Sequence, residues 1–135
     1  MSRKNVEIVR RAHAAWSAGD TEAASSVFDP TVRWHIAEDE PDAHVIEGIP
    51  GALEQLRKWA ASFDDFEVQT IEFIEAGDHV VVPQVFRGRG RNTAAVLEVD
   101  ETQVFLVQAG KVAEVRSYRT LDEALAAVGP PASQF

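Results

Sequence analysis

The sequence of 135 residues contains no cysteine, which excludes structural disulfides and thiolate metal sites. Basic residues are few: 13 Lys and Arg stand against 22 Asp and Glu, and the formal net charge is −9 at pH 7. Such a charge repels nucleic-acid phosphates and anionic membranes, so neither is an expected partner. The sequence also lacks an apolar run of transmembrane length, a secretory signal at its polar N-terminus, and histidine pairs with metal-ligand spacing. These absences predict a cytoplasmic protein without a metal site.

Hydrophobic residues make up 45% of the chain and charged residues 26%, which is the balance of a globular protein. The length suits one domain, and we expect residues 1–135 to form it. No linker or internal repeat divides the sequence.

Helical periodicity is clear in the first part of the chain. Ile8, Ala12 and Ala15 recur on one face of a first helix, which Gly19 ends. Asp20 is a good N-cap for a second helix, whose apolar stripe is predicted to run from residue 23 to Phe28. A third helix is predicted from Pro50 to Phe63. Between the second and third helices, a turn and short strand at "DPTVRWHI" precede a polar loop over residues 37–48.

From residue 66 onward the apolar period drops to two, which is typical of strands. Strands are predicted over residues 66–75, 79–88, 96–108 and 111–119. Hairpin turns are expected at Gly77-Asp78 and Ala109-Gly110. The sequence "TLDE" at 120–123 is a capping box for a last helix, which Gly129 and two prolines end.

Together these elements predict an α+β fold in which a curved antiparallel sheet is covered on one face by the three N-terminal helices, with a short C-terminal helix. A curved sheet closed on one side by helices forms a cone. Such a cone leaves an apolar cavity at its wide end, where ligands usually bind.

Five segments, in this order, resemble the nuclear transport factor 2-like superfamily on its SnoaL-like and ketosteroid-isomerase-like side. They are "AWSAGD…FDPTVRWH", "EGIPGALEQLRKW", "FIEAGDHVVV", "FLVQAGKVAEVRSY" and "LDEALAAVG". The resemblance covers about residues 5–129. It implies an α+β cone with a deep pocket, no bound cofactor, and a homodimer formed through the outer face of the sheet. Val96, Val104 and Leu106 are expected to form the apolar contact of that dimer.

The resemblance also locates the positions where relatives carry their catalytic groups. Ketosteroid isomerases use a general-base aspartate, a tyrosine and a protonated acid, and the matching positions here are Trp34, Ala12 and Gln103. Epoxide hydrolases and SnoaL-type cyclases carry an acid at the position of Ser117. Because none of these four residues is an acid or tyrosine, both chemistries are disfavoured. Gln103 can still donate a hydrogen bond to a carbonyl.

His35 is the remaining candidate for a base, because histidine titrates near neutrality. Strand alternation counts against it: if Trp34 faces the cavity, then His35 faces away. A partly exposed structural histidine is the simpler interpretation. His13, on the flank of the first helix, is expected to be a packing residue.

Three tryptophans are expected to line the cavity, although core packing explains each of them equally well. We expect the ligand-binding residues to be Trp16, Trp34, Trp59, Phe105, Val115, Ser117 and Arg119. Arg119 lies at a strand end, so its side chain either enters the cavity or extends into water.

Two function classes stay open at this point. One is a cofactor-independent isomerase, cyclase or hydrolase that acts on a small apolar carbonyl or polyketide-like compound, with Gln103 polarising an oxygen. The other is a non-catalytic protein that binds a small apolar molecule or a partner subunit, and that has lost the family's carboxylates.

Overall fold

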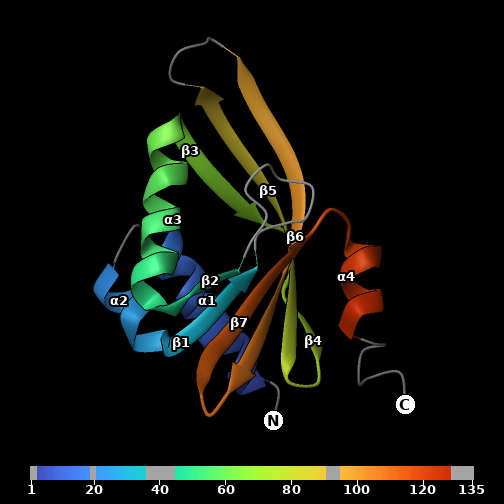
Figure 1. Ribbon diagram of the computed structural model, residues 1–135. Helices are drawn as coiled ribbons and strands as arrows, with labels where there is room; N and C mark the ends of the chain where they lie inside the picture. Colours follow the sequence, from blue (N-terminus) through green and yellow to red (C-terminus); the bar gives the residue numbers. More distant parts are fainter. Residues whose placement is uncertain (1–2, 19–20, 36–44, 91–94, 129–135) are drawn as a thin grey trace.

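The computed structural model describes residues 3–18, 21–35, 45–90 and 95–128. Its helices are α1 (Arg3–Ala18), α2 (Thr21–Val27), α3 (Gly48–Ser62) and α4 (Leu121–Val128). Its strands are β1 (Phe28–His35), β2 (Val45–Glu47), β3 (Phe63–Thr70), β4 (Ile74–Ala76), β5 (His79–Gly90), β6 (Val96–Gln108) and β7 (Lys111–Tyr118). Figure 1 shows α1, α2 and α3 on one side of a curved sheet and α4 on the other. We call the side toward α1–α3 the inner face and the side toward α4 the outer face.

The strands form one sheet in the order β2-β1-β7-β6-β5-β3, with β4 also paired to β5. The α+β class is confirmed, but the expectation of a purely antiparallel sheet is wrong, because β1 pairs with β7 in parallel. The strands from β3 to β7 form the expected succession of antiparallel neighbours. β1 instead enters beside β7 from before the third helix, and a parallel pair requires such a long connection.

Two of the expected strand limits are corrected. Residues 45–47 lie in the segment expected to be a loop, yet they form β2, in which Ile46 is paired with Trp34. The expected strand 66–75 is divided, because β3 pairs Thr70 with Gln84 while β4 pairs Ile74 with Val81. From Thr70 to Ile74 the segment that joins β3 to β4 advances four residues, while β5 advances three from Val81 to Gln84. One residue of the joining segment therefore bulges out of the ladder. Pro83 lies at this point of β5, where it has no N–H to offer a neighbouring strand.

The expected turns and the C-terminal cap are confirmed. Ala76 pairs with His79 and Gln108 pairs with Lys111, so two-residue turns lie at 77–78 and 109–110. In the second turn both Ala109 and Gly110 have positive φ, as the type I′ hairpin turn requires. At the start of α4 the Glu123 N–H donates to Thr120 Oγ1 at 3.1 Å, which is half of the predicted capping box.

The helix limits differ slightly from those expected. Phe28 was expected to end the second helix, but it is the first residue of β1 and is 4% exposed. Phe63 was expected to end the third helix and instead begins β3. Both aromatic residues stand where an amphipathic helix passes into a strand, and an apolar side chain fits either period there. Among the described residues, no helix combines the length and the apolarity needed to cross a membrane.

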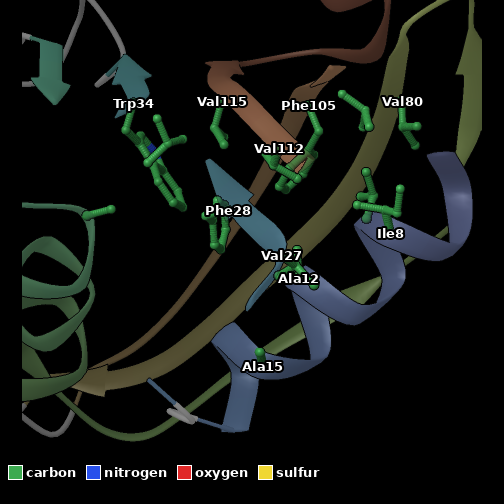
Figure 2. Close-up of a cluster of buried hydrophobic side chains, with 14 of the residues drawn as sticks. Ile8, Ala12, Ala15, Val27, Phe28, Trp34, Val80, Phe105, Val112 and Val115 are labelled. Carbon is green, nitrogen blue, oxygen red and sulfur yellow. The ribbon is translucent and has the colours of Figure 1, made fainter. Parts of the chain in front are cut away.

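The inner face holds the main core. The predicted stripe of α1 is confirmed, because Ile8, Ala12 and Ala15 are each 6% exposed or less and pack toward the sheet (Figure 2). Phe28 and Trp34 of β1 lie 6.2 Å apart between ring centroids in the same cluster. The strands β5, β6 and β7 contribute Val80, Val82, Phe105, Val107, Val112 and Val115.

The outer face holds a smaller core beneath α4. Ala124 of α4 packs there with Val81 and Val104, and Tyr118, Leu121 and Leu125 surround them. Val104 is only 2% exposed, so it is no part of an exposed apolar patch and that part of the expected dimer surface is wrong. Local residue types predict the helix but not the face of the sheet that it covers. Val96, by contrast, is 68% exposed.

Candidate functional site

Strand alternation arranges the inner face in rows of neighbouring side chains that cross the sheet. One row is apolar and joins Val80, Phe105, Val115 and Trp34 across β5, β6, β7 and β1. The next row contains Val82, Gln103 and Ser117, and the row after it contains Thr70, Gln84 and Glu101. We call the five polar residues of the last two rows, Thr70, Gln84, Glu101, Gln103 and Ser117, the inner polar rows. They are the candidate functional site.

Gln103 is a residue of these rows whose side-chain amide has incomplete hydrogen bonding. Its side chain is 3% exposed, and within the described residues its Nε2 is buried with no hydrogen-bond partner. Leaving a buried donor unpaired costs about 1–3 kcal/mol, so such groups usually have a partner. A ligand acceptor at this position would satisfy the amide.

His13 reaches the inner polar rows from α1. Its Nε2 lies 2.6 Å from Gln84 Oε1 and 3.2 Å from the Thr70 hydroxyl. Burial lowers the pKa of His13 below 6.5, and the hydrogen bond with Gln84 opposes this only in part. Because an amide oxygen can only accept, Nε2 carries the proton and the neutral ring keeps its lone pair on Nδ1. His13 does pack as expected, edge-on against Phe73, but it is also a polar group of the interior.

Three members of the inner polar rows, Thr70, Gln84 and Glu101, were not among the predicted site residues. Gln84 is 2% exposed, and Glu101 has a side-chain oxygen that is fully buried. A signal for both was present in the sequence. Gln84 follows Val80 and Val82 at period two, and Glu101 precedes Gln103 and Phe105 at the same period. What the sequence could not show was that His13 reaches Gln84 and Thr70 from a helix.

The predicted aromatic and aliphatic site residues divide into two groups. Trp34, Phe105 and Val115 are brought together on the inner face, where all three are members of the buried core. Figure 2 shows them side by side between β1, β6 and β7. The side chains of Trp16 and Trp59 lie outside the part of the chain that the structure describes. Convergence of the three indoles therefore stays a prediction.

Ser117, which the resemblance places on the cavity side, is the cross-strand neighbour of Gln103 on the inner face. Arg119 follows the last residue of β7 and is exposed, and its membership of the site stays a prediction. No group of three or more His, Cys, Asp or Glu that could hold a metal ion occurs in the described ranges.

His35 does not share a site with Gln103. Trp34 is on the inner face, so its neighbour on β1 points to the outer face, where His35 Nε2 lies 3.2 Å from Glu114 Oε2. A role of His35 as a base for an inner ligand therefore has no geometric support. Strand alternation therefore predicted the correct side of the sheet for His35.

Glu114 is the centre of the charged groups on the outer face. Its oxygens accept hydrogen bonds from Arg33 at 2.7 Å and from Arg116 at 2.8 Å. Burial alone would raise the pKa of Glu114, but the bonds from Arg116, Arg33 and His35 outweigh burial and lower the pKa to about 2. The carboxylate is therefore ionised throughout the neutral range.

A family model described as a SnoaL-like domain matches residues 9–115. An uncharacterized protein of Mycobacterium tuberculosis is 25% identical over 114 residues, which are 84% of this chain and 87% of the relative. Among solved structures, an NTF2-like protein from Burkholderia xenovorans LB400 has a TM-score of 0.74 and 26% identity, over 96% of this chain and 98% of that chain.

A proposed SnoaL-like polyketide cyclase from Jannaschia sp. CCS1 has a TM-score of 0.77 and 22% identity, over 96% of this chain and 95% of that chain. The family model spans well over half of the sequence, and the solved structures share its fold over nearly the whole length. The chain therefore belongs to the SnoaL-like family of the nuclear transport factor 2-like superfamily.

Proposed function

We propose that the protein binds a small apolar molecule carrying one carbonyl oxygen, in a cavity between the inner face and the helices that cover it. The oxygen accepts a hydrogen bond from Gln103 Nε2, and the apolar body lies over the row that contains Trp34, Phe105 and Val115. The remaining predicted residues, Trp16, Trp59, Ser117 and Arg119, belong to the same proposed site. No cofactor is part of the proposal.

The unpartnered Gln103 amide is the observation that carries the proposal. It is buried to 3% exposure and has apolar Val82 on one side and Ser117 on the other. Burial of an apolar ligand supplies roughly 25 cal/mol per Å², whereas one hydrogen bond adds about 1 kcal/mol and fixes orientation. Affinity would come from the apolar row and selectivity from the amide.

Paired ligands separate the two contributions. Binding of cyclic ketones and of the matching hydrocarbons can be measured by calorimetry with the wild type, Gln103→Leu and Gln108→Leu. Gln108 is an exposed residue at the end of the same strand and is the matched control. We expect Gln103→Leu to weaken the binding of ketones about fivefold and to leave the binding of hydrocarbons unchanged. Equal binding of ketones to all three proteins would overturn the proposal.

A catalytic version of this function is favoured by His13. The partly buried imidazole of His13, which contacts the inner polar rows and has a lowered pKa, is neutral at pH 7 and can take a proton from the carbon beside a carbonyl held by Gln103. This would make the protein a cofactor-independent isomerase, cyclase or hydrolase of the SnoaL-like type. Exchange of α-protons of a bound ketone with deuterated water, followed by NMR, tests it.

We expect the exchange to be lost in His13→Gln while the ketone still binds. Binding without exchange above the solvent rate in the wild type would favour the non-catalytic alternative.

We also propose that the protein is a homodimer. The support is Val96 at the start of β6, an apolar side chain that lies on the same side of the strand as Val104 and is 68% exposed. Val96→Lys is expected to convert a dimer to a monomer in analytical ultracentrifugation, and a wild-type monomer at micromolar concentration would contradict the proposal. The cytoplasmic location stays a prediction from the sequence.

A further inference from the structure

A hollow of about 330 Å³ lies on the outer face, between the C-terminal half of α4 and the strands β5, β6 and β7. We call it the outer hollow. Its apolar wall consists of Val104, Leu106, Ala127 and Val128, and its polar groups are His79, Glu114, Arg116 and Tyr118. A site of this volume is at the small end of the range for small-molecule sites, so it suits a compound with one ring or a short chain.

The charge around the outer hollow differs in sign from the charge of the whole chain. Glu114 is ionised and is bonded at one oxygen by Arg116 and at the other by Arg33. Two guanidinium groups against one carboxylate leave one positive charge, while the chain as a whole carries −9. The local field therefore favours an anion at a place where both oxygens of the nearest carboxylate are already occupied.

Arg116 presents this positive charge to the outer hollow. Its Nε donates to Glu114 Oε1 at 2.8 Å, and its side chain remains 46% exposed. A guanidinium carries five N–H groups, so one edge can hold Glu114 while another holds a second carboxylate. The hydrogen bond with Glu114 raises the pKa of Arg116 above its ordinary value; burial opposes this rise, and the charge of Glu114 and an electrostatic interaction and hydrogen bond with Tyr118 add to it.

We propose that the outer hollow binds a small apolar carboxylic acid in its ionised form. The carboxylate lies against the open edge of Arg116, beside the Tyr118 hydroxyl, and the apolar body lies against Val104, Leu106 and the end of α4. Such a bidentate pair is the geometry for which arginine is suited. The apolar wall distinguishes an organic acid from an inorganic anion.

This site is separate from the proposed inner site. Val104 and Arg116 are cross-strand neighbours on the outer face, and the residues that adjoin them, Gln103 and Ser117, are neighbours on the inner face. One layer of strands thus lies between the two sites. A substitution can therefore abolish ligand binding at one site without affecting the other.

Benzoate and hexanoate are suitable probes, with benzamide and inorganic phosphate as controls for charge and for apolar contact. Titrations followed by ¹H–¹⁵N NMR would use the full chain, Arg116→Gln, Ala127→Phe and Arg89→Gln. Ala127→Phe fills the hollow without a change of charge, and it keeps the test valid if Arg116→Gln fails to fold. Arg89 is an exposed arginine near the other end of β5 and gives the matched change of charge.

We expect benzoate to shift amide resonances of β6, β7 and α4. Both Arg116→Gln and Ala127→Phe are expected to weaken benzoate binding at least about tenfold. Arg89→Gln should bind as the wild type does. Equal weakening by Arg89→Gln, equal binding of benzamide, or no binding of either acid would overturn the proposal. Loss of a dimer in Arg116→Gln without any binding of the acids would show that a carboxylate of a second copy occupies the hollow, which also overturns it.

Discussion

The two faces of the sheet use the same strands for different purposes. The inner face is covered by α1, α2 and α3, and its polar groups within the described residues include amides, hydroxyls, the carboxyl group of Glu101 and a partly buried imidazole. The outer face is covered by α4 over part of its area and carries Arg33, Glu114 and Arg116 in direct contact. Figure 1 shows this unequal cover.

The difference shows how strand alternation places adjacent residues in an apolar and in a charged environment. Trp34 is 1% exposed in the inner core, while its neighbours Arg33 and His35 both contact Glu114 on the outer face. An unpaired charge is too costly on the inner face, where water is excluded by helices. On the outer face, a charged side chain such as Arg33 or Arg116 stays in contact with water and is paired with the opposite charge of Glu114. The amides and hydroxyls of the inner face therefore suit recognition of a neutral group, and the cluster of Arg33, Glu114 and Arg116 on the outer face suits an ionic ligand.

The largest expected effect comes from the inner face. Trp34→Ala should lower the free energy of unfolding by about 3–5 kcal/mol, because it removes a fully buried indole and leaves a void among Phe28, Val115 and their neighbours. Urea unfolding followed by circular dichroism measures this. Val96→Ala, at a residue that is 68% exposed, should change the value by less than about 0.5 kcal/mol. Similar losses for both variants would remove the distinction between core and surface.

Much of this comparison was predictable from the sequence. Period two assigned Trp34 and His35 to opposite faces and Gln103 and Phe105 to the same face, while the resemblance placed Ser117 on the cavity side. The hairpin turns and the cap of α4 followed from local residue types such as Ala109-Gly110 and Thr120. These features depend on neighbours in the chain, which a sequence displays.

Long-range contacts were not predictable in the same way. The parallel pairing of β1 with β7 joins Arg33 to Glu114, 81 residues apart, and His13 meets Gln84 across 71 residues. The burial of Val104 depends on where α4 packs. An acidic residue in a strand is expected to be exposed unless its partners are known. The sequence therefore did not indicate that Glu114 is buried and paired with arginines.

A moderate effect is expected at the outer face. Glu114→Gln should lower stability at pH 7 by about 1–2 kcal/mol, since the partly exposed Arg33 and Arg116 lose their common partner in a screened setting. The pKa of Glu114 is about 2 when folded against 4.5 as an ordinary value, so its contribution is complete above pH 4.5. It is lost as the pH falls toward 2.

Thermal unfolding of the wild type and Glu114→Gln across this range tests the sign. Glu98→Gln is the control, because Glu98 is 56% exposed in its pair with Arg87. A difference between wild type and Glu114→Gln that grows on acidification would contradict the assignment.

A smaller effect is expected from Gln103→Leu. Removal of a buried donor that lacks a partner should leave stability unchanged or raise it by up to about 1 kcal/mol, even though a core glutamine is replaced. Gln84→Leu is the comparison, because it removes a partner of His13 and should be destabilising. Destabilisation of the same size in both would mean that the Gln103 amide is satisfied within the protein.

The smallest effect is the pH dependence that His13 brings to the inner face. Its folded pKa lies below 6.5, so the unfolded chain binds more protons in the acid range. The contribution of neutral His13 to the stability of the fold is complete above pH 6.5 and declines as the pH falls below that value. The stability of His13→Gln should decline less over the same range in chemical unfolding experiments, and an equal decline would show that another group is responsible.

The side-chain amide resonance of Gln103 tests the central claim most directly. It can be assigned in a ¹H–¹⁵N spectrum by its loss in Gln103→Leu and then followed while a cyclic ketone or its matching hydrocarbon is added. The ketone is expected to move the amide protons downfield as they form a hydrogen bond, and the hydrocarbon is expected to leave them nearly unchanged. If the ketone binds and the Gln103 amide resonance stays in place, the inner face does not recognise a carbonyl through Gln103.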